Sequence, residues 1–236
     1  MAFLFSIASP AHTLTLDEVI KGVQSQRPGG ASGYGPQDQK TTISGLKEAL
    51  SIGTQNAVRT VARVDGYFGN ELIRILLPET LQKAAEVIGK LGYQQQVDQL
   101  VVSMNRAAEA AAPKAVSLFT QAIGEMTFDD AQKILQGGDT AATDFFKRKT
   151  SAKVFDQFKP VITSSMSKVG VAKAYKDMVA PYQALPFASK ETMDLDHYVT
   201  TKALEGLFLM VAEEEKKIRT DPAARVTDLL RKVFSK

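Results

Sequence analysis

Hydrophobic residues recur every three or four positions along most of the chain from Thr41 onward. This spacing places them on one face of a helix and predicts a series of amphipathic helices. The clearest stripes are Leu46, Leu50, Ala57 and Val61; Val97, Leu100, Val101, Met104, Ala108 and Ala111; Val171, Ala174, Tyr175, Met178, Val179 and Tyr182; and Val226, Leu229, Leu230, Val233 and Phe234.

One helix near the C-terminus differs from the others because residues 207–212 are apolar on every side. We expect this helix to lie in the centre of the core, surrounded by other helices. Residues 213–219 then become strongly charged, with Glu213 and Lys217, and Glu215 and Arg219, spaced for i, i+4 ion pairs. This run predicts a solvated helix end, and a carboxylate metal site is the alternative interpretation.

Several predicted helices have recognisable ends. Thr127 precedes the acidic residues of a first turn, Gly137 and Gly138 follow nine residues later, and Asp139 can cap the next helix. The pair Asp221-Pro222 combines a cap with a proline at the first helical position.

Two prolines and one apolar hexamer interrupt this pattern. Pro113 and Pro160 lie inside helical stripes, so each predicts a kink or a break between two shorter helices. No segment is a convincing strand. Residues 72–77, which end before Pro78, are short enough to form either an extended segment or one helical turn.

The N-terminal part predicts a different organisation. The apolar run of residues 2–8, followed by Ser9-Pro10-Ala11, resembles the end of a signal peptide, although an uncleaved apolar tail is the alternative because no Lys or Arg precedes it. Residues 12–41 then contain a short helix over about 15–25 and a linker rich in Gly and Pro. We therefore expect a signal segment over 1–11, a helix and flexible linker over 12–41, and a single helical domain over 42–236.

The composition excludes several classes of function. The 236 residues suffice for a hydrophobic core, and 29 basic against 26 acidic side chains give a net charge of +3, too balanced to suggest a nucleic acid partner. Because the chain has no Cys and only two His, thiolate chemistry and histidine-based sites lack their residues. No apolar run is long enough to span a membrane. We expect no cofactor, no metal and no catalytic motif.

Three clusters are candidates for contacts with a ligand or partner. Asn105, Arg106 and Glu109 share one side of an Ala-rich helix and form either a surface group or, if a second layer covers them, a buried polar network. Lys147 and Arg148, with Lys149, are predicted to end a helix, where they complement its dipole or contact an anion. Residues 194–197 place His197 beside two aspartates, which more simply cap a helix than bind a metal.

From Ile43 to the C-terminus, the chain resembles the bacterial family called domain of unknown function 4197. The resemblance lies in the motifs Gly45–Leu50, Met104–Glu109, Met126–Ala131, Ile134–Gly137, Leu195–Thr200, Lys202–Phe208, Ala212–Arg219 and Pro222–Arg225. It implies an envelope protein of helical fold and brings no established activity. Similar proteins often look like lipoproteins, and because this chain lacks Cys we expect a soluble periplasmic form.

These observations predict an all-α, non-enzymatic periplasmic protein, a multi-helix bundle that binds a hydrophobic small molecule or a lipid. The alternative is a module that presents a helical surface to another envelope protein, and the third is an unrecognised hydrolase. A continuous apolar cavity above about 300 Å³ would favour the first. A solid core with an exposed apolar patch would favour the second.

Overall fold

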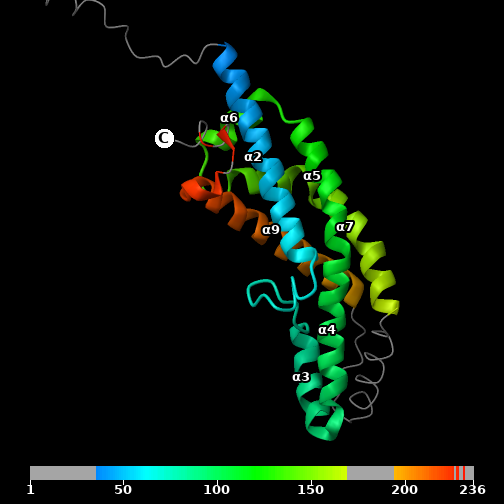
Figure 1. Cartoon of the computed structure of the whole chain (residues 1–236). Coiled ribbons are helices and arrows are strands. Elements are labelled where there is room, and N and C mark those ends of the chain that lie inside the picture. Colours follow the sequence, from blue (N-terminus) through cyan, green and yellow to red (C-terminus); the bar gives the residue numbers. More distant parts are fainter. Residues whose placement is uncertain (1–35, 169–193, 226, 229–230, 232–236) are drawn as a thin grey trace, which may run out of the picture. The chain divides into compact units, whose positions relative to one another are not determined.

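The computed structural model describes residues 36–168, 194–225, 227, 228 and 231, and within these residues the regular elements are all helices. The predicted all-α class is therefore confirmed. The helices, shown in Figure 1, are α2 (Pro36–Ala62), α3 (Glu79–Ile88), α4 (Gln94–Ala111), α5 (Ala115–Gly124), α6 (Phe128–Gln136), α7 (Ala141–Lys168) and α9 (Leu195–Thr220). Shorter turns are a π-helical one over Gly89–Tyr93 and two 3₁₀ turns over Ala112–Lys114 and Pro222–Ala224.

The first described helix begins earlier than the sequence suggests. Because α2 starts at Pro36, the last six residues of the segment 12–41 are helical and do not belong to a linker. Proline suits the first helical position, since its fixed φ angle is helical and it has no N–H to satisfy there. The predicted signal segment, the helix over 15–25, the stripe over 171–182 and most of the stripe over 226–234 lie outside the described residues.

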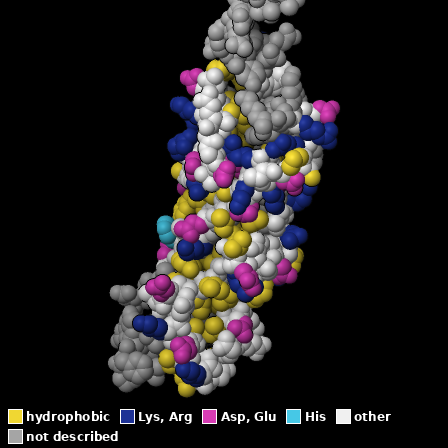
Figure 2. Space-filling view, turned by 90° about the vertical axis from the view of Figure 1, so that its left-hand side faces the viewer, with side chains coloured by type: hydrophobic (Ala, Val, Ile, Leu, Met, Phe, Trp, Pro, Cys, Tyr) yellow, Lys and Arg dark blue, Asp and Glu magenta, His cyan; other side chains and the backbone are white. Residues whose placement is uncertain are grey.

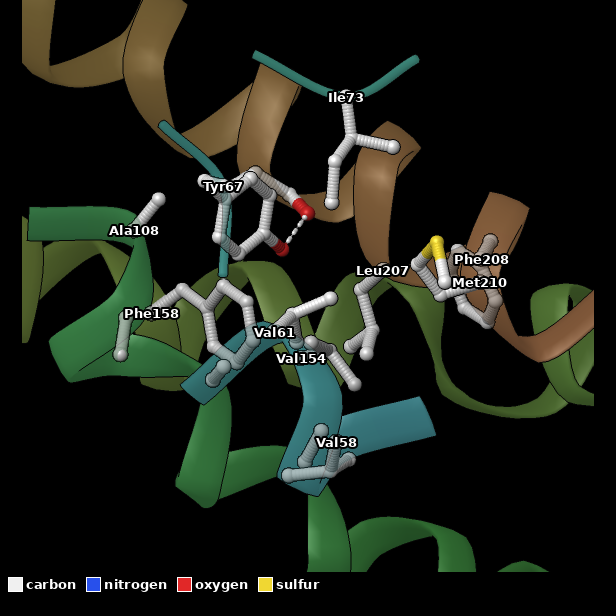
Figure 3. Close-up of a cluster of buried hydrophobic side chains, with 14 of the residues drawn as sticks. Val58, Val61, Tyr67, Ile73, Ala108, Val154, Phe158, Leu207, Phe208 and Met210 are labelled. Atoms are coloured by element: carbon white, nitrogen blue, oxygen red, sulfur yellow. Dashed lines mark hydrogen bonds between the residues drawn. The ribbon is translucent and has the colours of Figure 1, made fainter. Parts of the chain in front are cut away.

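Helix α7 is central to the core, where it packs mainly against α9 and α4 and also contacts α5 and α6. Its neighbouring rings Phe145 and Phe146 are fully buried, and Phe119 of α5 lies between Phe146 and Phe208 of α9, with ring centroids 5.1 and 6.0 Å apart. Figure 3 shows how Val154 and Phe158 of α7 meet side chains of α2, α4, α9 and the connection that follows α2 in this core. Alanines at the C-terminal end of α4 allow the close approach of its neighbours.

The two prolines inside helical stripes behave differently. Pro113 lies in the 3₁₀ turn between α4 and α5, so it marks the predicted break. Pro160 lies inside α7, which continues as one helix of 28 residues, so of the kink or break predicted at this position the break is absent. Val154, Phe158, Ile162 and Met166 are buried on one face on both sides of Pro160, and this packing offsets the lost backbone hydrogen bond.

Two predicted helix ends also differ from the structure. Lys147, Arg148 and Lys149 lie in the second and third turns of α7 and do not end it, because no glycine follows them and the buried stripe continues. Asp139 lies two residues before α7 and does not cap it. A side chain from α9 provides the cap instead, as described below. In contrast, Thr127 and Asp130 form the expected cap of α6 by binding each other's backbone N–H.

Candidate functional site

The segment 63–78 connects α2 to α3 and is the longest non-helical stretch within the described residues. Burial alternates along its second half: Ile73, Ile75 and Leu77 are buried, whereas Leu72 and Leu76 are exposed. Such a period of two is typical of an extended chain. Of the two interpretations of the hexamer 72–77, the extended segment holds for residues 74–77, whereas residues 71–73 form a turn in which the C=O of Asn70 accepts hydrogen bonds from the N–H groups of Ile73 and Arg74.

Asn105 of α4 binds the backbone of this extended segment. Its side-chain oxygen accepts a hydrogen bond from the N–H of Ile75, and its amide nitrogen donates to the C=O of Ile75, both at 2.8 Å. The amide nitrogen also donates to the C=O of Val101. Since Asn105 is fully buried, its polar atoms have their partners inside the protein.

Glu109, one turn further along α4, binds the first half of the same segment. Its buried Oε1 accepts hydrogen bonds from the N–H groups of Tyr67 and Phe68, at 3.1 and 3.3 Å. Its Oε2 pairs at 2.7 Å with Arg106, which pairs at the same distance with Asp65. The bonds to Glu109 and then to Asp65 raise the pKa of Arg106. The segment 63–78 is thus the layer that covers the cluster of Asn105, Arg106 and Glu109.

The other side of the segment lies against α9. The hydroxyl of the fully buried Tyr67 donates to the C=O of Ala203 at 2.6 Å (Figure 3), and burial, together with the charge of Glu109, raises the pKa of this phenol. Gly206 leaves room for the segment, since a Cβ there would lie 2.8 Å from the Tyr67 ring and 3.1 Å from Cβ of Ile73. Only a residue without a side chain fits this approach.

Two further contacts give the direction of the segment relative to α9. The amide of Asn70 donates to the sulfur of Met210 at 3.5 Å, and the hydroxyl of Tyr198 donates to the C=O of Leu76 at 3.0 Å. Partial burial, the largest cause, raises the pKa of Tyr198, so the phenol keeps the proton of this bond at neutral pH. Because the residue numbers of these two pairs run in opposite directions, residues 70–76 of the segment are antiparallel to α9.

A surface groove of about 400 Å³ lies between the extended segment and α9, and we call it the α9 groove. Its first wall is the segment Leu72–Leu76, and its second wall is formed by Tyr198, Lys202, Glu205 and Leu209, with Gly206 beside them. Helix α9 rises about 16 Å from Tyr198 to Leu209.

Three leucines of these walls are accessible to solvent: Leu72 is 71%, Leu76 54% and Leu209 39% exposed. Figure 2 looks at the side of the molecule that is on the left in Figure 1, where segment 63–78 lies. On it, hydrophobic side chains gather between scattered charged ones. The exposure of Leu209 also corrects the prediction that residues 207–212 are covered on every side, because α9 has no described neighbour over this one stripe.

The charged residues of the α9 groove lie in the middle of its walls. Lys202 and Glu205 form an ion pair of 2.7 Å, and the hydrogen bond to Glu205 raises the pKa of Lys202. Arg74 donates to the C=O of Phe68 and lies over its ring, and it makes no ion pair with any described carboxylate. The groove walls therefore carry two cations and one anion.

A second buried carboxylate, Glu215 of α9, caps the start of α7. Its two oxygens accept hydrogen bonds from the N–H groups of Ala142 and Thr143, at 2.9 and 2.8 Å, and Oε2 also accepts the Thr143 hydroxyl. The predicted pair with Arg219 is present at 2.8 Å, whereas Lys217 pairs with Glu214 and not with Glu213. The prediction of a solvated helix end is wrong for Glu215, because its partner is a helix terminus 72 residues away.

Lys147 and Arg148 are both exposed. Arg148 borders a shallow depression of about 480 Å³ together with Lys133, Asp130 and Asp144. Two acidic side chains in the same depression weaken its attraction for an anion. A role of Lys147 and Arg148 in binding an anion remains a prediction.

The cluster around His197 has the simpler of its two expected roles. Asp194 accepts a hydrogen bond from the His197 N–H as the cap of α9, and Asp196 accepts one from the Thr163 hydroxyl. Among the described residues, no group of three His, Cys, Asp or Glu side chains could bind a metal ion. Within the same part of the chain, no helix has the length and hydrophobicity required to cross a membrane.

The residues of the α9 groove were not among the sequence candidates. The sequence does not reveal which residues of 72–77 face outward, because all of them except Arg74 are apolar whether they face the core or the solvent. Asn105, Arg106 and Glu109 were correctly grouped: Asn105 binds the first wall of the groove from the inside at Ile75, and Glu109, paired with Arg106, binds the earlier part of the same segment at Tyr67 and Phe68.

The architecture and the site define an all-α protein with an open, partly apolar groove between the segment 72–76 and α9. Over residues 36–235 the chain matches the family described as "Protein of unknown function (DUF4197)". The chain belongs to this family, in agreement with the resemblance of its motifs. A search of curated proteins and a search of solved structures found no match.

Proposed function

We propose that this protein is a non-catalytic binding protein that takes an extended segment of another protein into the α9 groove. The observation that carries the proposal is the exposure of Leu72, Leu76 and Leu209 on both walls of one groove. Clustered exposed apolar side chains mark interaction sites. The proposal corresponds to the interaction module among the sequence-based alternatives.

Among the described residues, the distribution of space supports a protein ligand over an enclosed lipid. A void lined by Leu46, Ala49 and Ile218 measures about 20 Å³, which holds at most about one water molecule. The space near Leu72 and Leu209 that is large enough for a ligand lies at the surface. A hydrocarbon chain in this groove would also leave Arg74 without an anionic partner and would cover the ion pair of Lys202 and Glu205.

The backbone of the first wall supports an extended ligand. In an extended chain, neighbouring residues direct their N–H and C=O groups to opposite sides. Ile75 directs its groups to Asn105, so the C=O of Arg74 and the N–H of Leu76 face the opposite side, where Tyr198 reaches the C=O of Leu76. Neither of these two groups forms a hydrogen bond within the described part of the chain. A peptide strand can use such groups.

A peptide selection with matched variants tests this proposal. A library of random nine-residue peptides is selected for binding to the full chain, and the affinities of the selected peptides are measured by fluorescence anisotropy. Leu209→Arg should weaken binding at least about tenfold, because it places a charge against the apolar wall. Leu91→Arg is the matched control, since Leu91 is an exposed leucine (58%) outside the groove.

Two results would contradict the proposal. The first is that the library yields no peptide, or only peptides that bind Leu209→Arg as tightly as the unchanged chain. The second is that a fluorescent fatty acid binds the chain and loses affinity only in Leu209→Arg while no peptide binds. The second result would favour the small-molecule interpretation.

We also propose that the chain is exported and acts in the periplasm. The apolar residues 2–8 and the small residues at Ser9 and Ala11 support export. Fractionation of an expressing bacterium, followed by N-terminal sequencing of the recovered chain, tests this. Recovery of the intact N-terminus from the cytosol would contradict it.

A further inference from the structure

We infer that the protein segment bound in the α9 groove has an acidic residue between two apolar residues, each separated from it by one residue of any type. This inference rests on the proposed function and specifies the partner. It follows from the order of side chains along the two walls, from the charge of the middle of the groove, and from its length.

Both walls have the same order of side-chain types. Along the first wall, Leu72, Arg74 and Leu76 give apolar, basic, apolar, and all three line the groove. Along α9, Leu209 and Tyr198 enclose the charged pair of residues 202 and 205. Because the segment is antiparallel to α9, Leu72 lies toward the Leu209 end and Leu76 toward the Tyr198 end. The groove therefore has two apolar ends and a charged middle.

The charged middle favours an anion. Lys202 and Glu205 neutralise each other at 2.7 Å, whereas the guanidinium of Arg74 has no carboxylate partner within the described residues. The arginine guanidinium is a permanently charged group whose planar donors suit a carboxylate. A carboxylate placed between the two walls would thus complete the charge balance of the groove.

The dimensions agree with this arrangement. In an extended peptide, the side chains of residues one, three and five point to the same face, and four steps of about 3.3 Å span about 13 Å. Helix α9 rises about 16 Å between Tyr198 and Leu209. One peptide residue could accept a hydrogen bond from the N–H of Leu76 and donate one to the C=O of Arg74, which is the pairing of parallel strands.

The composition of selected peptides tests the inference. The nine-residue library is selected in parallel against the unchanged chain, Arg74→Glu, Arg74→Gln and Arg63→Glu. Arg63 is the matched control, because it is an exposed arginine of the same segment that does not line the groove. Far-UV circular dichroism of each variant establishes that it is folded.

We expect Asp or Glu at the central position for the unchanged chain and for Arg63→Glu, Lys or Arg for Arg74→Glu, and no charge preference for Arg74→Gln. In a selected peptide, replacing the central acid by its amide should weaken binding about two- to fivefold at low salt, as for an exposed ion pair.

The outcomes separate the two proposals. If the selected peptides depend on Leu209 but show no acidic preference, or if they keep the same acid with Arg74→Glu, the inference is wrong and the proposed function stands. If no peptide depends on Leu209, both are wrong.

Discussion

Replacement of Glu215 should destabilise the protein more than replacement of any charged residue at the surface. Glu215→Ala removes the acceptor of two backbone N–H groups at the start of α7 and the partner of Arg219. A buried donor left without a partner costs about 1–3 kcal/mol, and breaking one side of a buried ion pair costs about 3–5 kcal/mol. Because these terms overlap, we expect a loss of about 3–5 kcal/mol, a large part of the stability of a typical domain.

Glu215→Gln should cost less, because the amide oxygen can keep the bonds to Ala142 and Arg219. The amide nitrogen then faces Thr143, whose hydroxyl can rotate to accept but whose N–H cannot. One unsatisfied donor predicts a loss of about 1–3 kcal/mol. This variant also keeps the test possible if Glu215→Ala does not fold.

Urea unfolding followed by circular dichroism at 222 nm measures both losses. Glu213→Ala and Glu213→Gln are the matched controls, because Glu213 lies on the same helix and forms no hydrogen bond or ion pair with the described residues. Their effect should stay within about 0.5 kcal/mol. Equal losses for Glu213 and Glu215 would refute the conclusion that a carboxylate of α9 caps α7.

Three further perturbations test other contacts. Asn105→Ala should cost at least about 2 kcal/mol in urea unfolding, because it leaves the N–H and C=O of Ile75 buried without partners. Asn105→Asp should not restore this loss, since a carboxylate repels the C=O of Ile75. Thr127→Ala should cost about 1 kcal/mol of unfolding free energy. The Thr127 hydroxyl, and then its backbone N–H, lower the pKa of Asp130. The difference in unfolding free energy between the unchanged chain and the variant should therefore be complete above pH about 4 and decrease as the pH falls through the lowered pKa. Gly206→Ala should cost about 1–3 kcal/mol of unfolding free energy, since the new methyl group would lie 2.8 Å from the Tyr67 ring. It should also shift the nuclear magnetic resonance signals of Tyr67. Unchanged spectra would contradict the close packing.

The helices could be predicted from the sequence because their burial follows the same period as the sequence pattern. Leu46, Leu100 and Met104 are buried as their spacing requires. The absence of a break at Pro160 has a physical reason: the intrinsic cost of proline is local, whereas the stripe on both sides of it is anchored by tertiary contacts. A sequence pattern shows the local cost of proline but not the tertiary contacts that offset it.

The polar candidates could be predicted in part. The spacing of Asn105, Arg106 and Glu109 shows that they share a helix face, but their partners are 30 to 42 residues away in the sequence, in a segment without helical periodicity. Glu215 presents the same difficulty, since its i, i+4 partner Arg219 is visible and the start of α7 is not. In the groove, an exposed leucine such as Leu209 looks like a core leucine when its neighbours are apolar on every side.

The buried polar contacts explain why exposed leucines can stand in a fixed position beside α9. The outer side chains Leu72 and Leu76 contribute little burial, so the hydrophobic packing that holds the segment comes from Ile73, Ile75 and Leu77 on its inner face. Asn105 and Glu109 bind its backbone from the inside, and Tyr198 binds it from α9, so hydrogen bonds supply what the outward leucines do not. The first wall of the α9 groove is therefore formed before any ligand arrives. A preformed wall lowers the entropy that binding must overcome, which makes a short peptide a sufficient ligand.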